Sequence, residues 1–222
     1  MELDDALLLY KINVNNGIGQ IDIDGSLSVG DQTVGDKTTI NSSGQLTLSG
    51  EGTIFNDVQF SIATAKQPPV NAPTWAAFIG NLGKYTFAVN DYVDLEAQEI
   101  PHGTLPGSDK EWHIHIFTNG LEAVDKVVNF QIEFAITAED EAPTVLTVSG
   151  DFTIPANTPD QTKLYIHVGI VNGTGQDFEN DISAQVKRIA AVSGTAPAAD
   201  PFVSMVGLHV EQYKLGSENR TS

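Results

Sequence analysis

Hydrophobic and polar residues alternate along most of this chain, with the period of two that is typical of a β-strand. Similar alternating stretches recur between residues 85 and 213, separated by loops rich in Gly, Pro, Asn and Asp, and no amphipathic helix lies between them. The clearest stretch is "VVNFQIEFAIT" (127–137), with apolar positions at Val128, Phe130, Ile132, Phe134 and Ile136. The pattern predicts an all-β domain of about eight strands, a number that favours a jelly-roll β-sandwich over an immunoglobulin-like one.

The alternation is thinner in residues 1–60, where Gly, Ser, Thr and Asp separate single apolar residues, as in "GQIDIDGSLSVG" (19–30). Such strands bury too little apolar surface to offset the entropy of ordering them. We therefore expect an N-terminal short-strand segment that needs partner chains. The candidate interface residues are Leu7, Leu8, Leu9, Tyr10, Ile21, Ile23, Leu27 and Val29.

Prolines at positions 68, 69 and 73 interrupt the alternation, because proline cannot donate a hydrogen bond to a β-ladder. Within this stretch, "PTWAAFIGN" is consistent with one short helical turn capped by Thr74. A fragment beginning near residue 80 is expected to fold as a sandwich without the residues that precede it. The expected organisation is an N-terminal β segment at 1–60, a Pro-rich connection at 61–84, the jelly-roll β-sandwich at 85–213 and a tail at 214–222.

Composition narrows the classes of function. The 222 residues include 29 acidic and 11 basic ones, for a formal charge of −18, which argues against binding bare nucleic acid because phosphate contacts need clustered Lys and Arg. The absence of cysteine excludes disulfides, thiol nucleophiles and cysteine-based zinc sites. No apolar run approaches the length of a membrane helix, and the acidic N-terminus does not resemble a signal peptide. We expect no membrane partner and synthesis in the cytoplasm without a signal peptide.

The stretch "EWHIHIF" (111–117) is the strongest candidate for chemistry. Alternation places Trp112, Ile114 and Ile116 on one face of a strand, and His113 and His115 on the other. Two histidines at this spacing can share a metal ion, or they can pack on a polar face. Cupins, which are jelly rolls, use such a pair together with a Glu a few residues later and a further His.

The surroundings of this pair depart from the cupin pattern. The next Glu along the chain, Glu122, comes later than that pattern requires. His167 also lies opposite an apolar series and is the candidate for a distant third ligand, whereas His102 and His209 have no partner that the sequence specifies. Packing is therefore the favoured interpretation.

No other stretch carries a catalytic motif: a Gly-rich phosphate loop before a helix and a nucleophile elbow are both absent. We assign no catalytic, cofactor-binding or metal-binding residue, and we expect no cofactor. We expect the unmodified chain to bind no stoichiometric transition metal. Replacement of both His113 and His115 by Gln is expected to leave folding and assembly nearly intact.

Two runs, "FNDVQFSIATAKQPPVNAPTWAAF" and "YTFAVNDYVDLEAQEIPHGTLPGSDKEWHIHIFTNG", resemble virion structural proteins of tailed bacteriophages. The resemblance covers roughly residues 40–210. The positions that carry it are Asn56-Asp57, Lys66, Ala72-Pro73, Pro101-His102 and His113-Ile114-His115. Gly103 stands where an aromatic residue usually follows the Pro-His pair, so no ligand role is carried over to that loop.

The resemblance implies a jelly-roll domain that assembles as a homotrimer on the virion. It indicates a non-catalytic capsid decoration (cement) protein on the capsid exterior, bound to the major capsid protein and stabilising the shell at capsomer joints. Residues 1–60 would then serve oligomerisation or shell attachment. An alternative is a tail-associated fibre or adhesin that binds a host receptor or glycan. A third alternative, from the His-x-His pair alone, is a cupin-like metal enzyme.

Overall fold

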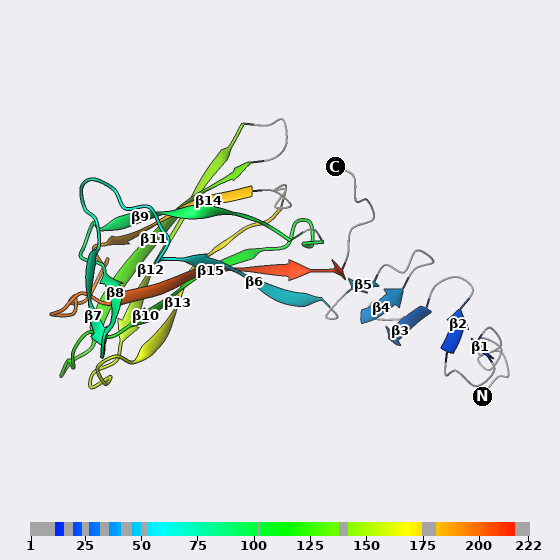
Figure 1. The fold of residues 1–222 in the computed structure, drawn as a ribbon, viewed down its shortest axis with the longest axis horizontal. Helices are drawn as coiled ribbons and strands as arrows, with labels where there is room; N and C mark the ends of the chain where they lie inside the picture. Colours follow the sequence, from blue (N-terminus) through cyan, green and yellow to red (C-terminus); the bar gives the residue numbers. More distant parts are fainter. Residues whose placement is uncertain are drawn as a thin grey trace. The chain divides into compact units, whose positions relative to one another are not determined.

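Every regular element that the structure describes is a β-strand (Figure 1), so the all-β prediction is confirmed. The structure is a computed structural model. It describes residues 12–15, 20–23, 27–31, 36–40, 46–49, 53–101, 103–137, 142–174 and 181–215. None of these residues forms a helix that is long and apolar enough to span a membrane. The chain divides into two compact units, one made of residues 1–54 and 212–222, the other of residues 55–211.

The larger unit is a sandwich of two sheets. The alternating stretch 127–137 lies on β11 (Lys126–Thr137), and all of its alternating apolar side chains are buried. This strand belongs to the second sheet, whose order is β12-β11-β14-β9. The other strands of the second sheet are β12 (Thr144–Ile154), β14 (Asp181–Ile189) and β9 (Tyr92–Glu99).

The first sheet has the order β13-β10-β15-β8-β7, and β6 also pairs with β15. Its strands are β13 (Lys163–Val171), β10 (Lys110–Phe117), β15 (Phe202–Gln212), β8 (Leu82–Thr86), β7 (Thr74–Ile79) and β6 (Ile54–Ser61). The paths β6-β15-β10-β13 and β9-β14-β11-β12 give two facing sets of four strands, which is the jelly-roll arrangement, and β8 and β7 extend the first sheet to six strands. The predicted fold class is therefore confirmed.

The interior between the sheets is filled by apolar side chains from both. The ring of Trp112 on β10 lies 5.4 Å from that of Phe60 on β6 and 5.1 Å from that of Phe134 on β11, measured between centroids. Aromatic side chains bury large apolar areas, so the packing of these three rings holds the two sheets together.

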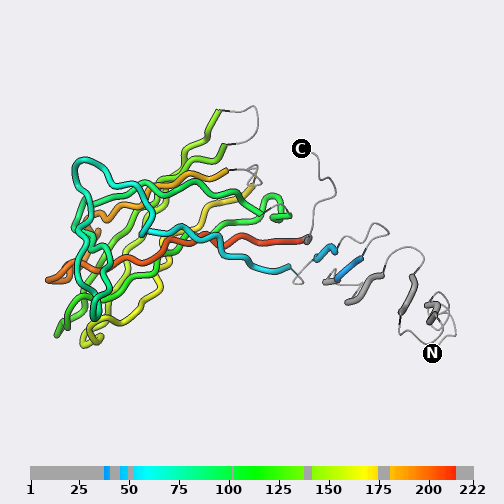
Figure 2. The backbone as a smooth tube through the Cα atoms, in the orientation of Figure 1, coloured from blue at the N-terminus to red at the C-terminus, as the bar shows by residue number. Residues whose placement is uncertain are grey.

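One strand of the sandwich comes from the segment assigned to the N-terminal part. β6 runs beside β15 (Figure 2), and the alternation of Val58, Phe60 and Ile62 buries all three side chains in the core. The jelly roll thus begins at about residue 54 and not at residue 85. The sequence pattern alone did not show this, because three alternating apolar residues are equally compatible with the thin strands before them.

The expected helical turn at residues 73–81 is wrong. Thr74–Ile79 is strand β7, which forms a hairpin with β8. The turn between Ile79 and Leu82 has two residues and begins at Gly80, whose φ of 56° suits a glycine. Trp75 is paired with Tyr85 across the hairpin, with ring centroids 4.8 Å apart. An aromatic cross-strand pair of this kind favours the strand over a single helical turn.

The smaller unit consists of short strands from both ends of the chain. β1 (Ile12–Asn15) pairs with β2 (Gln20–Ile23), and a separate sheet has the order β16-β5-β4-β3. The members of that sheet are β16 (Lys214–Leu215), β5 (Leu46–Ser49), β4 (Asp36–Ile40) and β3 (Leu27–Asp31). The C-terminal segment 214–222, expected to be a tail, thus contributes β16 to this sheet.

Candidate functional site

The histidine pair lies on the outer face of the first sheet. On β10, Trp112, Ile114 and Ile116 point into the core and are fully buried, so His113 and His115 point away from the second sheet. This confirms the assignment of faces made from the sequence. An ion enclosed between the two sheets would need histidines on the inner face of β10, and this strand has none there.

Pairing of β10 with its two neighbours gathers further polar side chains on the same outer face. β13 lies on one side of β10 and β15 on the other. The cross-strand partners are His113 with His167 and Gly207, His115 with Tyr165 and Met205, and Glu111 with His209. Residues that are about 50 to 100 positions apart in the sequence therefore meet within one patch.

His113 is the centre of this patch. Only 1% of its surface is exposed, because the Tyr165 ring stacks on it at 4.8 Å and the His209 and His115 rings lie 4.4 and 5.2 Å away. Burial lowers the pKa of His113 to about 4; the carboxylate of Asp57 opposes this shift, and His209 and His115 add to it. The imidazole is therefore neutral near pH 7 and keeps a lone pair on one ring nitrogen.

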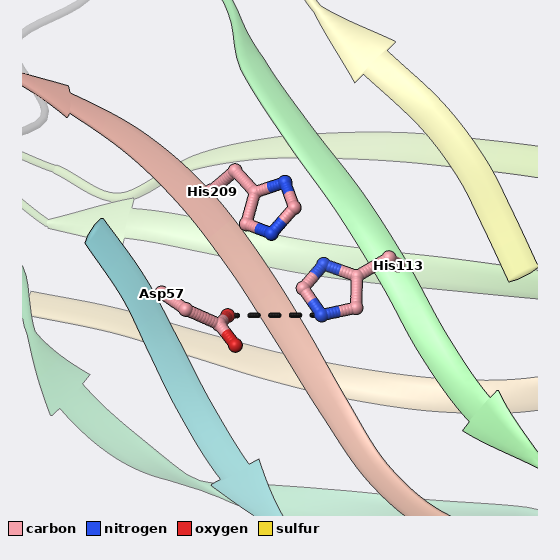
Figure 3. Close-up of side chains that lie close together, drawn as sticks. All are labelled: Asp57, His113 and His209. Atoms are coloured by element: carbon pink, nitrogen blue, oxygen red, sulfur yellow. Dashed lines mark ion pairs between the residues drawn. The ribbon is translucent and has the colours of Figure 1, made fainter. Parts of the chain in front are cut away.

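Asp57 reaches the same place from β6. Its Oδ1 lies 3.7 Å from Nε2 of His113 (Figure 3), although β15 runs between the two strands that carry them. Gly207 on β15 makes this approach feasible. A Cβ at this position would lie 2.3 Å from Cε1 of His113 and 2.6 Å from Oδ1 of Asp57, closer than such atoms can come. Any residue other than glycine would have to displace one of the two side chains.

Two polar atoms of this arrangement are buried without a hydrogen-bond partner, Oδ1 of Asp57 and Nδ1 of His113. Leaving a buried polar group unsatisfied costs about 1–3 kcal/mol. Most buried polar atoms in native proteins have partners, and an exception calls for an explanation such as strain, a functional role, or a bound water or ion. In this protein, Asp57 and His113, which face each other across Gly207, both carry this cost in stability.

Glu111 links the remaining side chains of the patch. It accepts a 2.6 Å hydrogen bond from the Tyr165 hydroxyl, and it lies 4.0 Å from Nε2 of His167 and 3.8 Å from Nδ1 of His209. Burial alone would raise the pKa of Glu111, but the hydrogen bond from Tyr165 and the nearby His167, His209 and His113 outweigh it and lower the pKa. Burial and the bond to Glu111 raise the pKa of Tyr165, so its hydroxyl stays protonated.

An open pocket of about 440 Å³ adjoins the patch. It shares Glu111 and His209 with the patch, so solvent reaches the histidine cluster from this side. The lining residues are Phe55, Asp109, Lys110, Glu111, Ile170 and His209. Strict alternation along β13 would place Ile170 on the same face as the buried Ile166 and Val168, but Ile170 is 58% exposed. The reason is a register shift between β10 and β13 next to Trp112, which moves this end of β13 out of phase.

Asp57, His113 and His209 form a group with the composition and spacing of a metal site. Each offers one ligand atom, and these atoms lie within 4.8 Å of one another (Figure 3). The residues come from β6, β10 and β15, the three strands that meet at Gly207. Two imidazoles and one carboxylate are ligands that divalent transition metals accept.

The structure groups the histidines differently from the sequence-based interpretation. His167, expected as a distant third ligand, faces Glu111 and is outside this group. Glu122 lies elsewhere, in an ion pair with Lys126. His209 had no partner from sequence, and Asp57 belonged to a different predicted segment. His102 is outside the described residues. The alternation of β15 could have placed His209 on an outer face, but only the strand order brings it beside His113.

The expected interface residues fall in the N-terminal part of the chain. Leu7, Leu8, Leu9 and Tyr10 lie outside the described residues. Ile21 and Ile23 lie on β2, and Leu27 and Val29 on β3. The structure describes these two strands by their backbone pairing, in which Ile23 is opposite Ile12 and Leu27 is opposite Ile40.

Comparisons with known proteins identify no family for this chain. No protein-family model and no curated protein matches the sequence. Among solved structures, the chain is similar to a CBM35 from Cellvibrio japonicus Abf62, with 13% sequence identity and a TM-score of 0.35. That alignment covers 69% of this chain and 92% of the other. A likeness of this size carries no argument about function.

Proposed function

We propose that this chain is a non-catalytic virion structural protein of a tailed bacteriophage, and specifically a homotrimeric capsid decoration (cement) protein on the capsid exterior. It would bind the major capsid protein at capsomer joints and hold the shell together. The proposal begins with the sequence resemblance described above. The strongest structural support is the division of the chain into two units. One is a sandwich with a packed apolar core, and the other consists of short strands with few apolar residues.

The exposure of apolar side chains in the smaller unit supports its association with further chains. Among its described side chains, Leu48 is the buried hydrophobic one, at 9% exposure, whereas Ile40 and Ile54 are exposed. If the rest of the sheet buries as little apolar surface as these described side chains do, it does not offset the entropy of ordering its strands. Pairing with copies of itself would cover these side chains and the strand edges, as a trimer requires.

The sandwich supports a binding role more than a catalytic one. Its interior is occupied by apolar side chains from both sheets, and the polar patch around His113 lies outside it. A cupin-like enzyme would use histidines that point into the barrel. A rigid sandwich presented many times on a shell suits a protein that works by contact alone.

The tail-associated alternative also has an observation in its favour. Trp75 is 57% exposed on the β7–β8 hairpin, and its indole lies directly over Gly83, where a Cβ would be 2.4 Å from the ring. Exposed, fixed aromatic rings are suited to binding a host glycan or receptor. On this alternative the chain would be an adhesin or a fibre component.

Particles made without this chain distinguish the two roles. A decoration protein predicts that shells assemble without it but break at a lower temperature, and that a stained gel of normal particles shows it at hundreds of copies. An adhesin predicts tens of copies, and mutant particles that are equally robust but no longer attach to host cells. Imaging of intact particles then shows whether density for the chain lies on the shell or on the tail.

A further inference from the structure

The three side chains at Gly207 point to a ligand that is a cation. We infer that Asp57, His113 and His209 form a binding site for one divalent transition-metal ion of the Zn²⁺ class on the outer face of the sandwich. The inference rests on the geometry of this group and is independent of the proposed role on the virion.

The spacing is close to that of a coordinated ion. In a tetrahedral zinc site with bonds of about 2.0–2.1 Å to nitrogen and oxygen, ligand atoms are about 3.3 Å apart. Oδ1 of Asp57 and Nε2 of His113 are separated by 3.7 Å, and the ligand atoms of all three residues by at most 4.8 Å. Small side-chain rotations would close the remaining gap. Asp57 and His209 are both partly exposed, whereas His113 is buried, so the adjustment falls on the side chains of Asp57 and His209.

The surroundings favour occupation of the site. Gly207 leaves open the space that a Cβ would fill between His113 and Asp57. Oδ1 of Asp57 is buried without a hydrogen-bond partner, and a bound cation would remove the cost of that unsatisfied oxygen. The mixed nitrogen and oxygen donor set disfavours Ca²⁺ and Mg²⁺, which prefer oxygen ligands alone.

Glu111 acts as a positioning residue for one ligand. It lies 3.8 Å from Nδ1 of His209, and the hydroxyl of Tyr165 holds its other oxygen. A carboxylate beside the non-coordinating nitrogen of a histidine orients the ring in many metal sites. Three protein ligands leave a fourth position open, and the adjoining pocket that His209 lines gives water or a small ligand access to it.

The test is a titration of the full, untagged chain after removal of metals with a chelator. Calorimetry with Zn²⁺ is expected to show one ion per chain, and saturation should raise the melting temperature. Co²⁺ should give visible absorption bands from coordination by nitrogen and oxygen. Asp57→Asn, which keeps the size of the side chain, and His209→Gln should each weaken Zn²⁺ binding by at least about tenfold, the loss typical of damage to a metal site.

His167→Gln is the matched control, because His167 is on the same face and also approaches Glu111 but is outside the group of three. It should bind Zn²⁺ as the unmodified chain does. The inference is overturned if no saturable one-to-one binding is found, or if His167→Gln weakens binding as much as Asp57→Asn does. Gly207→Ala gives an independent check. It should abolish binding even where the metal-free melting temperature shows that the chain is folded, and retained affinity in the folded variant would contradict the inference.

Discussion

At the scale of single residues, burial distinguishes the two histidines of the His-x-His pair. His113 is packed among three rings, whereas His115 is half-exposed at the edge of the patch. The two residues share a strand and a face but differ in environment. The two histidines should therefore contribute differently to stability, and the small effect expected from the sequence for the double Gln replacement should apply to His115 alone.

Replacing them one at a time should separate their roles. His113→Gln removes a buried ring from a stack with Tyr165 and His209 and should lower the free energy of unfolding by about 1–2 kcal/mol. His115→Gln should change it by less than about 0.5 kcal/mol. Urea denaturation in the presence of a chelator measures both without a contribution from metal. Equal effects of the two replacements would show that burial of His113 does not matter.

Lys110 gives a pH dependence that can be measured. The side chain is buried, and its Nζ donates hydrogen bonds of 2.5 Å to the carbonyl and 2.6 Å to the hydroxyl of Ser108. Burial lowers its pKa from 10.5 to about 8, against the opposing effect of Glu211 and Asp109. Below pH 8 both the folded and the unfolded chain carry the proton. Between pH 8 and 10 the folded chain releases it first, so the contribution of Lys110 to stability rises with pH.

Comparison with Lys110→Met isolates this contribution. The difference in the free energy of unfolding between the unmodified chain and Lys110→Met should move in favour of the unmodified chain as the pH rises from 8 to 10. Lys163→Met, on the exposed side of neighbouring β13, serves as the control and should show no comparable trend. A Lys110→Met difference that is constant over this range would refute the expected change in protonation.

At the scale of elements, β6 decides where the sandwich begins. It covers part of the edge of β15 and contributes Val58 and Phe60 to the core. It also carries Asp57, so the same strand completes both the fold and the candidate metal site. The β7–β8 hairpin extends the same sheet.

Two fragments test this boundary. A fragment of residues 53–213 should unfold cooperatively as a sandwich. A fragment that begins at residue 80, as the sequence pattern suggested, lacks β6 and β7, exposes apolar core and an unpaired strand edge, and should melt far lower or aggregate. Near-ultraviolet circular dichroism and thermal melting provide the measurement. Equal stability of the two fragments would show that β6 is dispensable.

At the scale of the whole molecule, the proposed function assigns independent folding to the sandwich and association between copies to the smaller unit. The sandwich has its own core, while the smaller unit exposes Ile40 and Ile54. The full chain should therefore sediment as a trimer, and the fragment of residues 53–213 should be largely monomeric at the same concentration. A fragment that is as firmly trimeric as the full chain would move the subunit contacts to the sandwich.

The charge of −18 sets a second expectation at this scale. If the chain binds the capsid, part of the attraction between the two surfaces is electrostatic and weakens as salt screens the charges. Contacts by Leu7, Leu8, Leu9 and Tyr10, which lie outside the described residues, would resist salt. Removal of residues 1–10 should therefore lower occupancy on the shell more than moderate salt does. Occupancy can be measured from the band intensity of this chain in gels of purified particles. If salt lowers occupancy more than the deletion does, binding to the shell is mainly electrostatic.

The sequence by itself determined the all-β class, the jelly-roll type and the face on which His113 and His115 lie, because alternation is a local property that each strand carries in its own residues. Only the tertiary structure decided that β6 joins the sandwich, that residues 74–79 form a strand, and that Asp57 and His209 approach His113. Those results depend on which strands are neighbours, and strand order is set by packing over the whole sandwich. Gly207 shows the difference. In the sequence it is one of 20 glycines. In the fold its missing side chain lets Asp57 of β6 and His113 of β10 approach each other across β15.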